Sequence, residues 1–109
     1  MRNLATFLVK LRNDVFKILP MKEAANEGED NHLGDYIYSL IITSEGALST
    51  YSRLSTEKPY IYVINNLNYL HNHPDLSLTN WRKVILNSTR GLNDLYLKYE
   101  QEEQSNERN

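Results

Sequence analysis

The sequence has no cysteine, and it has only four glycines and three prolines among its 109 residues. Without cysteine the chain can form neither a disulfide framework nor a thiolate zinc site, so a hydrophobic core has to hold the fold together. The scarcity of glycine and proline belongs to a residue usage that is typical of AT-rich bacterial or phage genes.

Long apolar runs are also missing. The apolar residues 4–9 follow Arg2 but stop at Lys10, and no small-residue cleavage site comes after them, so they do not resemble a signal peptide. No other run approaches the roughly 20 apolar residues of a membrane span. We therefore expect a soluble, cytoplasmic protein that does not contact a membrane.

Charge of one sign is not in excess, since the formal net charge is -2 and the isoelectric point is near 5.9. Such a balance provides no overall field that would attract nucleic acid. The length suits one compact domain. We expect a single helical domain over residues 1–101 and a flexible acidic and polar tail over residues 102–109, because the tail lacks apolar residues.

The apolar residues that are present recur at helical spacing. The clearest stripe runs through residues 76–99, where Ser77 can cap the first turn and Leu76 and Trp81 can form a hydrophobic staple around it. Its seam consists of Trp81, Ile85, Ser88, Leu92, Leu95 and Tyr99. This stretch predicts the organising helix of the fold.

Three further stripes predict three further helices. The first covers residues 3–19, with Pro20 kinking the chain or opening a short helix over residues 21–26, and residues 27–32 form a loop. The second begins at Leu33 and ends at Gly46, and its wide apolar surface, which includes Tyr38 and Ile42, indicates a central position. The run of residues 41–43 would also suit a strand.

Residues 47–57 are predicted to be a loop with one helical turn. The third helix begins near Pro59 and continues to Leu70, and Pro74 separates it from the fourth. The short connection makes these last two helices antiparallel neighbours. The sequence therefore predicts an all-α fold, a compact bundle of four principal helices with one or two short extra helical turns.

No motif for catalysis stands out. There is no glycine-flanked nucleophilic serine, no Walker loop and no dinucleotide fingerprint, and the acidic residues 27–35 lie in a loop without a matching second set. His71, His73 and Asp75, with His32, could in principle bind zinc or nickel, but residues at a helix end more often cap carbonyls or meet water. We expect no enzyme activity, no small-molecule substrate, no cofactor and no metal.

The third helix carries the main candidate for a binding site. Its side opposite the apolar stripe holds Tyr62, Asn65, Asn66, Tyr69 and His73, and no acidic or basic residue lies between Lys58 and Asp75 other than histidine. Tyrosine among uncharged polar groups is typical of the core of a protein interface. The alternative is that this helix is central and buries both tyrosines. We expect a protein interaction or regulatory module that binds a protein partner or forms a homodimer.

The rival hypothesis is a nucleic-acid-binding accessory protein. The first and last helices are locally basic, and Lys83, Asn87 and Arg90 share one face of the last helix, although Asp94 continues that face. Mixed charge on an outer helix face is normal, so we expect no strong nucleic-acid binding. The abundance of asparagine, isoleucine, leucine and tyrosine is typical of AT-rich genes and suggests a phage or mobile-element accessory protein acting in the host cytosol.

Overall fold

The computed structural model describes residues 3–108, and every regular element in that range is helical. The elements are α1 (Asn3–Phe16), α2 (Ile18–Asn26), α3 (Leu33–Thr50), the short 3-10 helix η1 (Ser52–Thr56), α4 (Lys58–Asn72) and α5 (Leu78–Arg108). The predicted all-α bundle of four principal helices is confirmed, with α1 and α2 together forming the first of them. The strand considered for residues 41–43 is wrong, because these residues lie inside α3.

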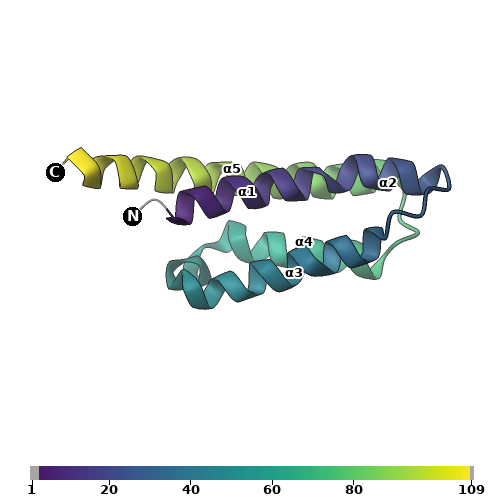
Figure 1. Cartoon of the computed structure of the whole chain (residues 1–109), viewed down its shortest axis with the longest axis horizontal. Helices are drawn as coiled ribbons and strands as arrows, with labels where there is room; N and C mark the ends of the chain where they lie inside the picture. Colours follow the sequence, from purple (N-terminus) through teal and green to yellow (C-terminus); the bar gives the residue numbers. More distant parts are fainter. Residues whose placement is uncertain (1–2, 109) are drawn as a thin grey trace.

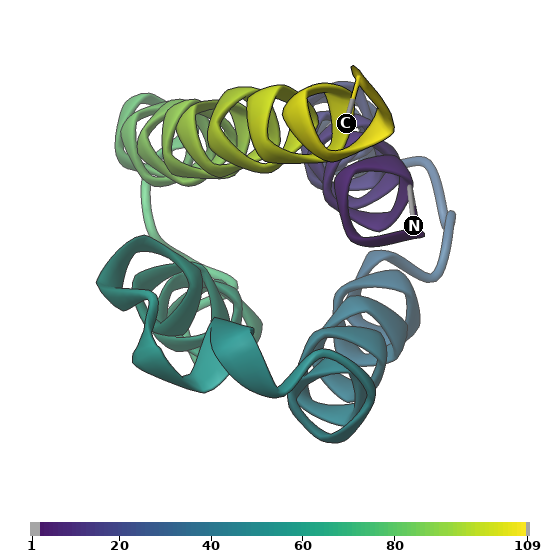
Figure 2. The same ribbon diagram turned by 90° about the vertical axis from the view of Figure 1, so that its left-hand side faces the viewer.

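The helices form two layers in an elongated bundle of 53 × 21 × 20 Å. One layer contains α1 and α2, which follow each other along nearly one line, and the long helix α5 beside them (Figure 1). The other layer contains the antiparallel pair α3 and α4. The predicted hairpin joins the two layers, because α4 and α5 are antiparallel neighbours. Seen from the end, the four rods surround one central core (Figure 2).

Each helix contributes one apolar stripe to this core. The largest fully buried side chains are Trp81 on α5 and Tyr60 on α4. The Tyr60 hydroxyl donates a hydrogen bond to the carbonyl oxygen of Ser44 on α3, at 2.6 Å, which joins the two helices of the α3–α4 layer inside the core. Burial of the phenol raises the pKa of Tyr60 to about 12.

The start of α5 is as the sequence predicts. The Ser77 hydroxyl accepts a hydrogen bond from the backbone N–H of Asn80, at 3.2 Å, so Ser77 caps the first turn. Leu76 packs against the core next to the buried Trp81. Lys22 of α2 places its ammonium group 4.7 Å from the Trp81 ring centroid and donates to the Pro74 carbonyl oxygen at 2.7 Å, which fixes α2 to this end of the bundle.

The break between α1 and α2 falls at Lys17, three residues before the predicted position at Pro20. Proline has no N–H, so Pro20 cannot donate to the carbonyl of Phe16 four residues earlier. The bond from Met21 N–H to the Lys17 carbonyl is correspondingly long, at 3.4 Å. The missing donor thus disturbs the turn before the proline, and Pro20 itself lies inside α2.

The predicted end of the second helix at Gly46 is wrong, because α3 continues to Thr50. Ala47 extends the buried stripe of α3, and Leu54 of η1 is fully buried beyond it. Burial of these apolar side chains outweighs the cost of about 1 kcal/mol that an exposed glycine imposes on a helix. Residues 47–57, predicted as a loop, therefore contain the last turn of α3 and η1.

In the C-terminal segment α5 continues to Arg108. The flexibility expected of residues 102–109 stays a prediction, and Asn109 lies outside the described residues. Glu103 is buried, and its Oε1 accepts a hydrogen bond from the backbone N–H of Ala5, at 3.4 Å, at the start of α1. A carboxylate at that place is favourable because the first amides of a helix are unpaired and carry partial positive charge.

Candidate interaction surfaces

The exposed large hydrophobic side chains of the described residues divide between the two layers. Four lie on the α3–α4 layer and three on the layer of α1 and α5; they are Tyr38, Ile42, Tyr62 and Tyr69, and Phe16, Leu86 and Leu97. A monomer has little reason to expose such groups together, so each cluster is a candidate contact surface.

The predicted α4 site faces solvent. Tyr62 is 53% exposed and Tyr69 is 43% exposed, and Asn65 and His73 are exposed beside them. The core stripe of α4 lies on its other side and consists of Tyr60, Val63, Ile64, Leu67 and Leu70. The alternative that buries Tyr62 and Tyr69 against other helices is therefore wrong.

Local contacts order part of this surface. The His73 ring stacks on the Tyr69 ring with centroids 4.3 Å apart, and His73 Nδ1 lies 2.8 Å from the Tyr69 carbonyl oxygen. Asn66 is different, because it is half-buried and its side-chain amide donates to the Ser88 hydroxyl of α5 at 2.9 Å. Asn66 thus helps to join α4 to α5 at the edge of the surface.

The structure adds two residues of α3 that sequence reasoning assigned to a wide buried stripe. Tyr38 and Ile42 are each about half exposed. The Tyr38 ring lies 5.9 Å from the ring of His71 on α4, so it bridges the two helices on their outer side. We call the exposed residues Tyr38, Ile42, Tyr62, Asn65, Tyr69 and His73 of α3 and α4 the neutral face. Its α3 part approaches α4 at His71, whereas Tyr62 and Tyr69 flank Asn66 on the side of α4 next to α5. The unusual width of the apolar stripe on α3 is the sequence feature that could have identified Tyr38 and Ile42 as members of the neutral face.

Charge is nearly absent from the helices that form the neutral face. The charged residues of α3 and α4 are Asp35, Glu45 and Lys58; His71 lies at the C-terminal end of α4, and His73 follows it. The other layer carries most of the lysine, arginine and acidic residues. The two layers therefore present surfaces of different chemistry.

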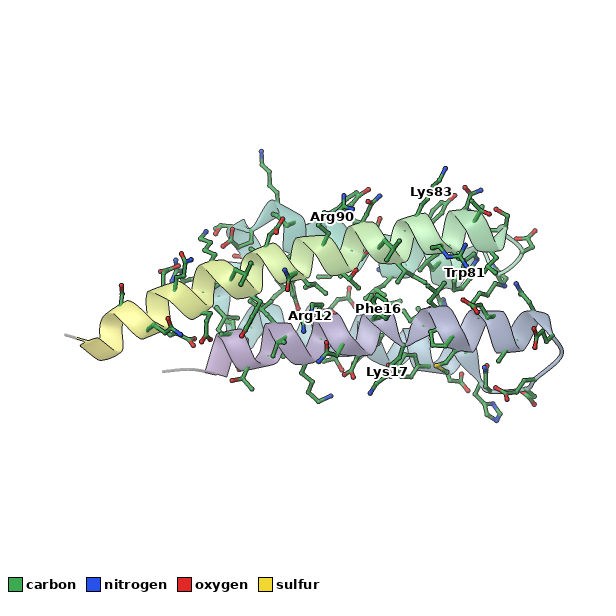
Figure 3. All side chains as sticks on the ribbon, turned by 90° about the horizontal axis from the view of Figure 1, so that it is seen from above. Arg12, Phe16, Lys17, Trp81, Lys83 and Arg90 are labelled. Carbon is green, nitrogen blue, oxygen red and sulfur yellow. The ribbon has the colours of Figure 1, made fainter. Side chains whose placement is uncertain are left out.

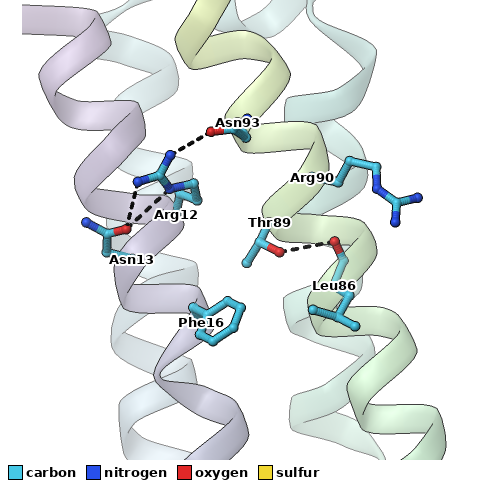
Figure 4. A pocket seen from close by; sticks show the side chains of 7 residues that line it. All are labelled: Arg12, Asn13, Phe16, Leu86, Thr89, Arg90 and Asn93. Carbon is cyan, nitrogen blue, oxygen red and sulfur yellow. Dashed lines mark hydrogen bonds between the residues drawn. The ribbon is translucent and has the colours of Figure 1, made fainter.

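A groove of about 360 Å³ lies between α1 and α5 on the charged layer. Its lining consists of Arg12, Asn13, Phe16, Leu86, Thr89, Arg90 and Asn93, and we call it the α1–α5 groove. Phe16 extends from α1 toward α5, whereas the Arg90 side chain extends away from Arg12 (Figure 4). Arg12 Nη1 donates to Asn93 Oδ1 at 2.6 Å, and Nε and Nη2 donate to Asn13 Oδ1 at 3.2 and 3.1 Å.

The residues of the nucleic-acid hypothesis are exposed on α5. Lys83, Asn87 and Arg90 lie on its outer surface, and within residues 3–108 neither Lys83 nor Arg90 forms an ion pair. Figure 3 shows Lys83 and Lys17 at opposite edges of the layer, with α1 and α5 between them. Lys17 is itself paired with Asp14 at 3.4 Å. The basic side chains of the two helices are therefore not brought into one continuous strip.

A polar cluster where α4 begins joins that helix to α5. The carboxylate of Glu57 accepts hydrogen bonds from Lys98 Nζ at 2.8 Å and from the Tyr99 hydroxyl at 2.5 Å. Burial acts to raise the pKa of Glu57, but these two bonds outweigh it, so the pKa is below its usual value. The same burial and the Glu57 charge raise the pKa of Tyr99 to about 12. Lys98 and Tyr99 both bond to Oε2 of Glu57, an arrangement that is typical of a structural ion pair.

The histidines considered for metal binding have separate surroundings. His71 contacts Tyr38, His73 stacks on Tyr69, and His32 lies in the loop before α3, about 4 Å from carboxylate oxygens of Asp30 and Asp35. In the part of the chain that the structure describes, no three His, Asp or Glu side chains are grouped as they would be around a metal ion. Within residues 3–108, moreover, none of the helices combines the length and apolarity needed to cross a membrane.

No protein-family model, no curated protein and no solved structure matches this chain.

Proposed function

We propose that this protein is an interaction module that binds a protein through its neutral face, and that a second copy of the chain is the simplest partner. The observation that carries this proposal is the exposure of three tyrosines and one isoleucine on two helices that have almost no charge. Tyrosine supplies a large contact area at a small cost in conformational entropy, and depletion of charge marks the core of an interface.

The geometry supports a flat contact of helix against helix. Tyr62 and Tyr69 are seven residues apart on α4 and so lie on one side of it, about 10 Å apart along the axis. Tyr38 and Ile42 are four residues apart on α3, next to α4. A second copy that placed the same face here would bury these side chains in a symmetric contact, which is the commonest form of homo-oligomer.

The experiment compares the wild-type protein with the double variant Tyr62→Ala and Tyr69→Ala by sedimentation velocity over a wide range of concentration. We expect the wild type to associate and the double variant to remain monomeric with a nearly unchanged melting temperature, because exposed side chains contribute little to folding. The matched control is Leu86→Ala with Leu97→Ala, which removes two exposed leucines from the opposite layer and should leave association intact.

Two results would refute self-association through this face. One is a wild-type protein that stays monomeric throughout the range. The other is a double variant that associates as well as the wild type does. If the wild type stays monomeric, binding to a different protein is tested by capture from extracts of the source cell. The wild type and the double variant are used side by side, and the proposal requires a protein that only the wild type retains.

The composition adds a proposal about context. A small module without a catalytic motif, encoded with an AT-rich residue usage, fits a phage or mobile-element accessory protein that acts on a host protein in the cytosol. The nucleic-acid alternative rests on Lys83, Asn87 and Arg90, and its test is given in the Discussion.

A further inference from the structure

We propose that the α1–α5 groove is a second binding site, and that it takes a short amphipathic helix of a partner protein with acidic residues flanking its apolar side. The groove lies on the layer opposite the neutral face, so this inference does not rest on the proposed function. It draws on three observations: the charge of the groove, the spacing of its exposed apolar residues, and the separation of the other basic side chains from it.

The charge of the groove is positive and uncompensated. Arg12 is held by the side-chain oxygens of Asn13 and Asn93, which are neutral acceptors. These three bonds use three of the five N–H groups of the guanidinium, and the other two can donate to a carboxylate. None of the lining residues is acidic. The nearby Asp14 is already paired with Lys10 at 2.7 Å and with Lys17.

The asparagines also prepare Arg12 for such a ligand. A long arginine side chain normally loses rotamer freedom when it binds, and here that freedom is already restricted by bonds to both helices. Arg12 additionally lies 5.8 Å from the centroid of the Tyr96 ring on α5. The guanidinium is therefore positioned between α1 and α5 before a partner arrives.

On α5 the lining of the groove continues at helical spacing to Leu97, an exposed leucine that lies beyond the lining itself. On α5, Leu86, Arg90, Asn93 and Leu97 are separated by four, three and four residues, which places them along one side of the helix. Leu86 and Leu97 are thus about 16 Å apart along the axis. Phe16, half exposed, stands on the α1 side. A docked helix of about three turns would span this distance with apolar residues at i, i+4, i+7 and i+11.

The same residues suit a peptide better than a nucleic acid. A phosphate backbone needs a row of cations, but Lys17 and Lys83 lie at the two outer edges of the layer, away from the groove (Figure 3). Asp94 follows on α5 beyond Arg90. Arg12 beside the exposed Phe16 and Leu86 instead matches a ligand that combines apolar side chains with a few carboxylates.

The test uses the 109-residue protein labelled with nitrogen-15 and a synthetic helical peptide of about five turns, with leucine at i, i+4, i+7 and i+11 and glutamate at the flanking positions. We expect it to shift the amide resonances of residues that line the α1–α5 groove. A second peptide has glutamine at each glutamate position and so loses the charge-assisted bonds. Its affinity should be lower by a factor of roughly ten or more.

Protein variants then assign the contacts. Arg12→Gln and Phe16→Ser should each weaken binding of the acidic peptide roughly tenfold, and both residues are exposed enough for the variants to fold. Lys83→Gln is the matched control, because it removes an exposed charge from α5 outside the groove. The affinity of this variant for the acidic peptide should stay close to that of the wild type.

Several outcomes would overturn the inference. An acidic peptide that shifts no resonance, or only resonances of the neutral face, would show that the α1–α5 groove does not bind it. Equal binding of the glutamine peptide would show that charge does not contribute. A single-stranded oligonucleotide that shifted the groove resonances more strongly than the peptide would identify a nucleic-acid site. Groove shifts that grew with protein concentration alone would identify a second copy as the occupant.

Discussion

The Tyr99 hydroxyl of α5 donates a 2.5 Å hydrogen bond to Oε2 of Glu57, 42 residues earlier in the chain, at the residue before α4. Lys98 donates to the same oxygen. This one carboxylate thereby connects the two layers of the bundle where η1 leads into α4. Its lowered pKa means that folding is coupled to its ionisation.

The first prediction follows from that coupling. Glu57→Gln should lower the free energy of unfolding by about 1–2 kcal/mol at neutral pH, because the hydrogen bonds to a charged acceptor are lost. The loss is no larger because Lys98 is exposed, so its Coulomb attraction to Glu57 is weak. A group with a lowered folded-state pKa stabilises the fold above its unfolded pKa and loses that effect as the pH falls. The difference between the variant and the wild type should therefore shrink below pH 4.5, the ordinary value for glutamate.

Urea denaturation over a series of pH values measures this effect. Glu102→Gln is the control, since its partner Arg53 is exposed and such a surface pair contributes little. A pH-independent difference between Glu57→Gln and the wild type would contradict the account of Glu57.

The second prediction concerns Trp81, which is 1% exposed. Trp81→Ala should reduce the free energy of unfolding by roughly 3–5 kcal/mol, because it removes the largest core side chain and the ring that Lys22 contacts. Thermal melting followed by circular dichroism measures the loss. Trp81→Phe, which retains an aromatic ring, should lose clearly less, and a change below about 1 kcal/mol for the alanine variant would place Trp81 outside the core.

A third prediction concerns Gly46, which lies in the interior of α3. A Cβ at Gly46 would meet no atom within 4 Å, so Gly46→Ala should raise the free energy of unfolding by about 1 kcal/mol through helix propensity alone. Gly91→Ala in α5 is the comparison, because its Cβ would lie 3.6 Å from the Pro59 Cβ, which is ordinary contact. Destabilisation by Gly46→Ala, measured by urea denaturation, would be inconsistent with a helix that continues through residue 46.

The fourth prediction addresses nucleic acid. Random-sequence DNA or RNA should bind weakly or not at all at physiological salt, because the basic residues of α1 and α5 are separated and partly paired with acidic ones. Filter binding or fluorescence anisotropy at several salt concentrations provides the measurement. Micromolar binding that falls steeply with salt would refute the prediction, and Lys83→Gln with Arg90→Gln should then abolish it.

The sequence alone was sufficient for the fold class. Periodic burial along one side of each helix depends only on local spacing, so the stripe from Trp81 to Tyr99 and the Ser77 cap could be recognised without coordinates. The same reasoning selected the outer side of α4, because Tyr62 and Tyr69 lie opposite the stripe of Val63 and Leu67. Local spacing could not show whether another helix covers that outer side.

Only the tertiary structure decided which residues far apart in sequence meet. Arg12 and Asn93, 81 residues apart, form one wall of a groove that neither helix reveals by itself. Glu103, which the sequence places beyond the last apolar residue, meets the first amides of α1, 98 residues away. Tyr38 and Ile42 share the apolar pattern of a buried stripe, and they are exposed because a helix in a four-rod bundle has neighbours on its inner side only. Such outcomes depend on how whole helices are placed around the core, which is a property of the assembled chain.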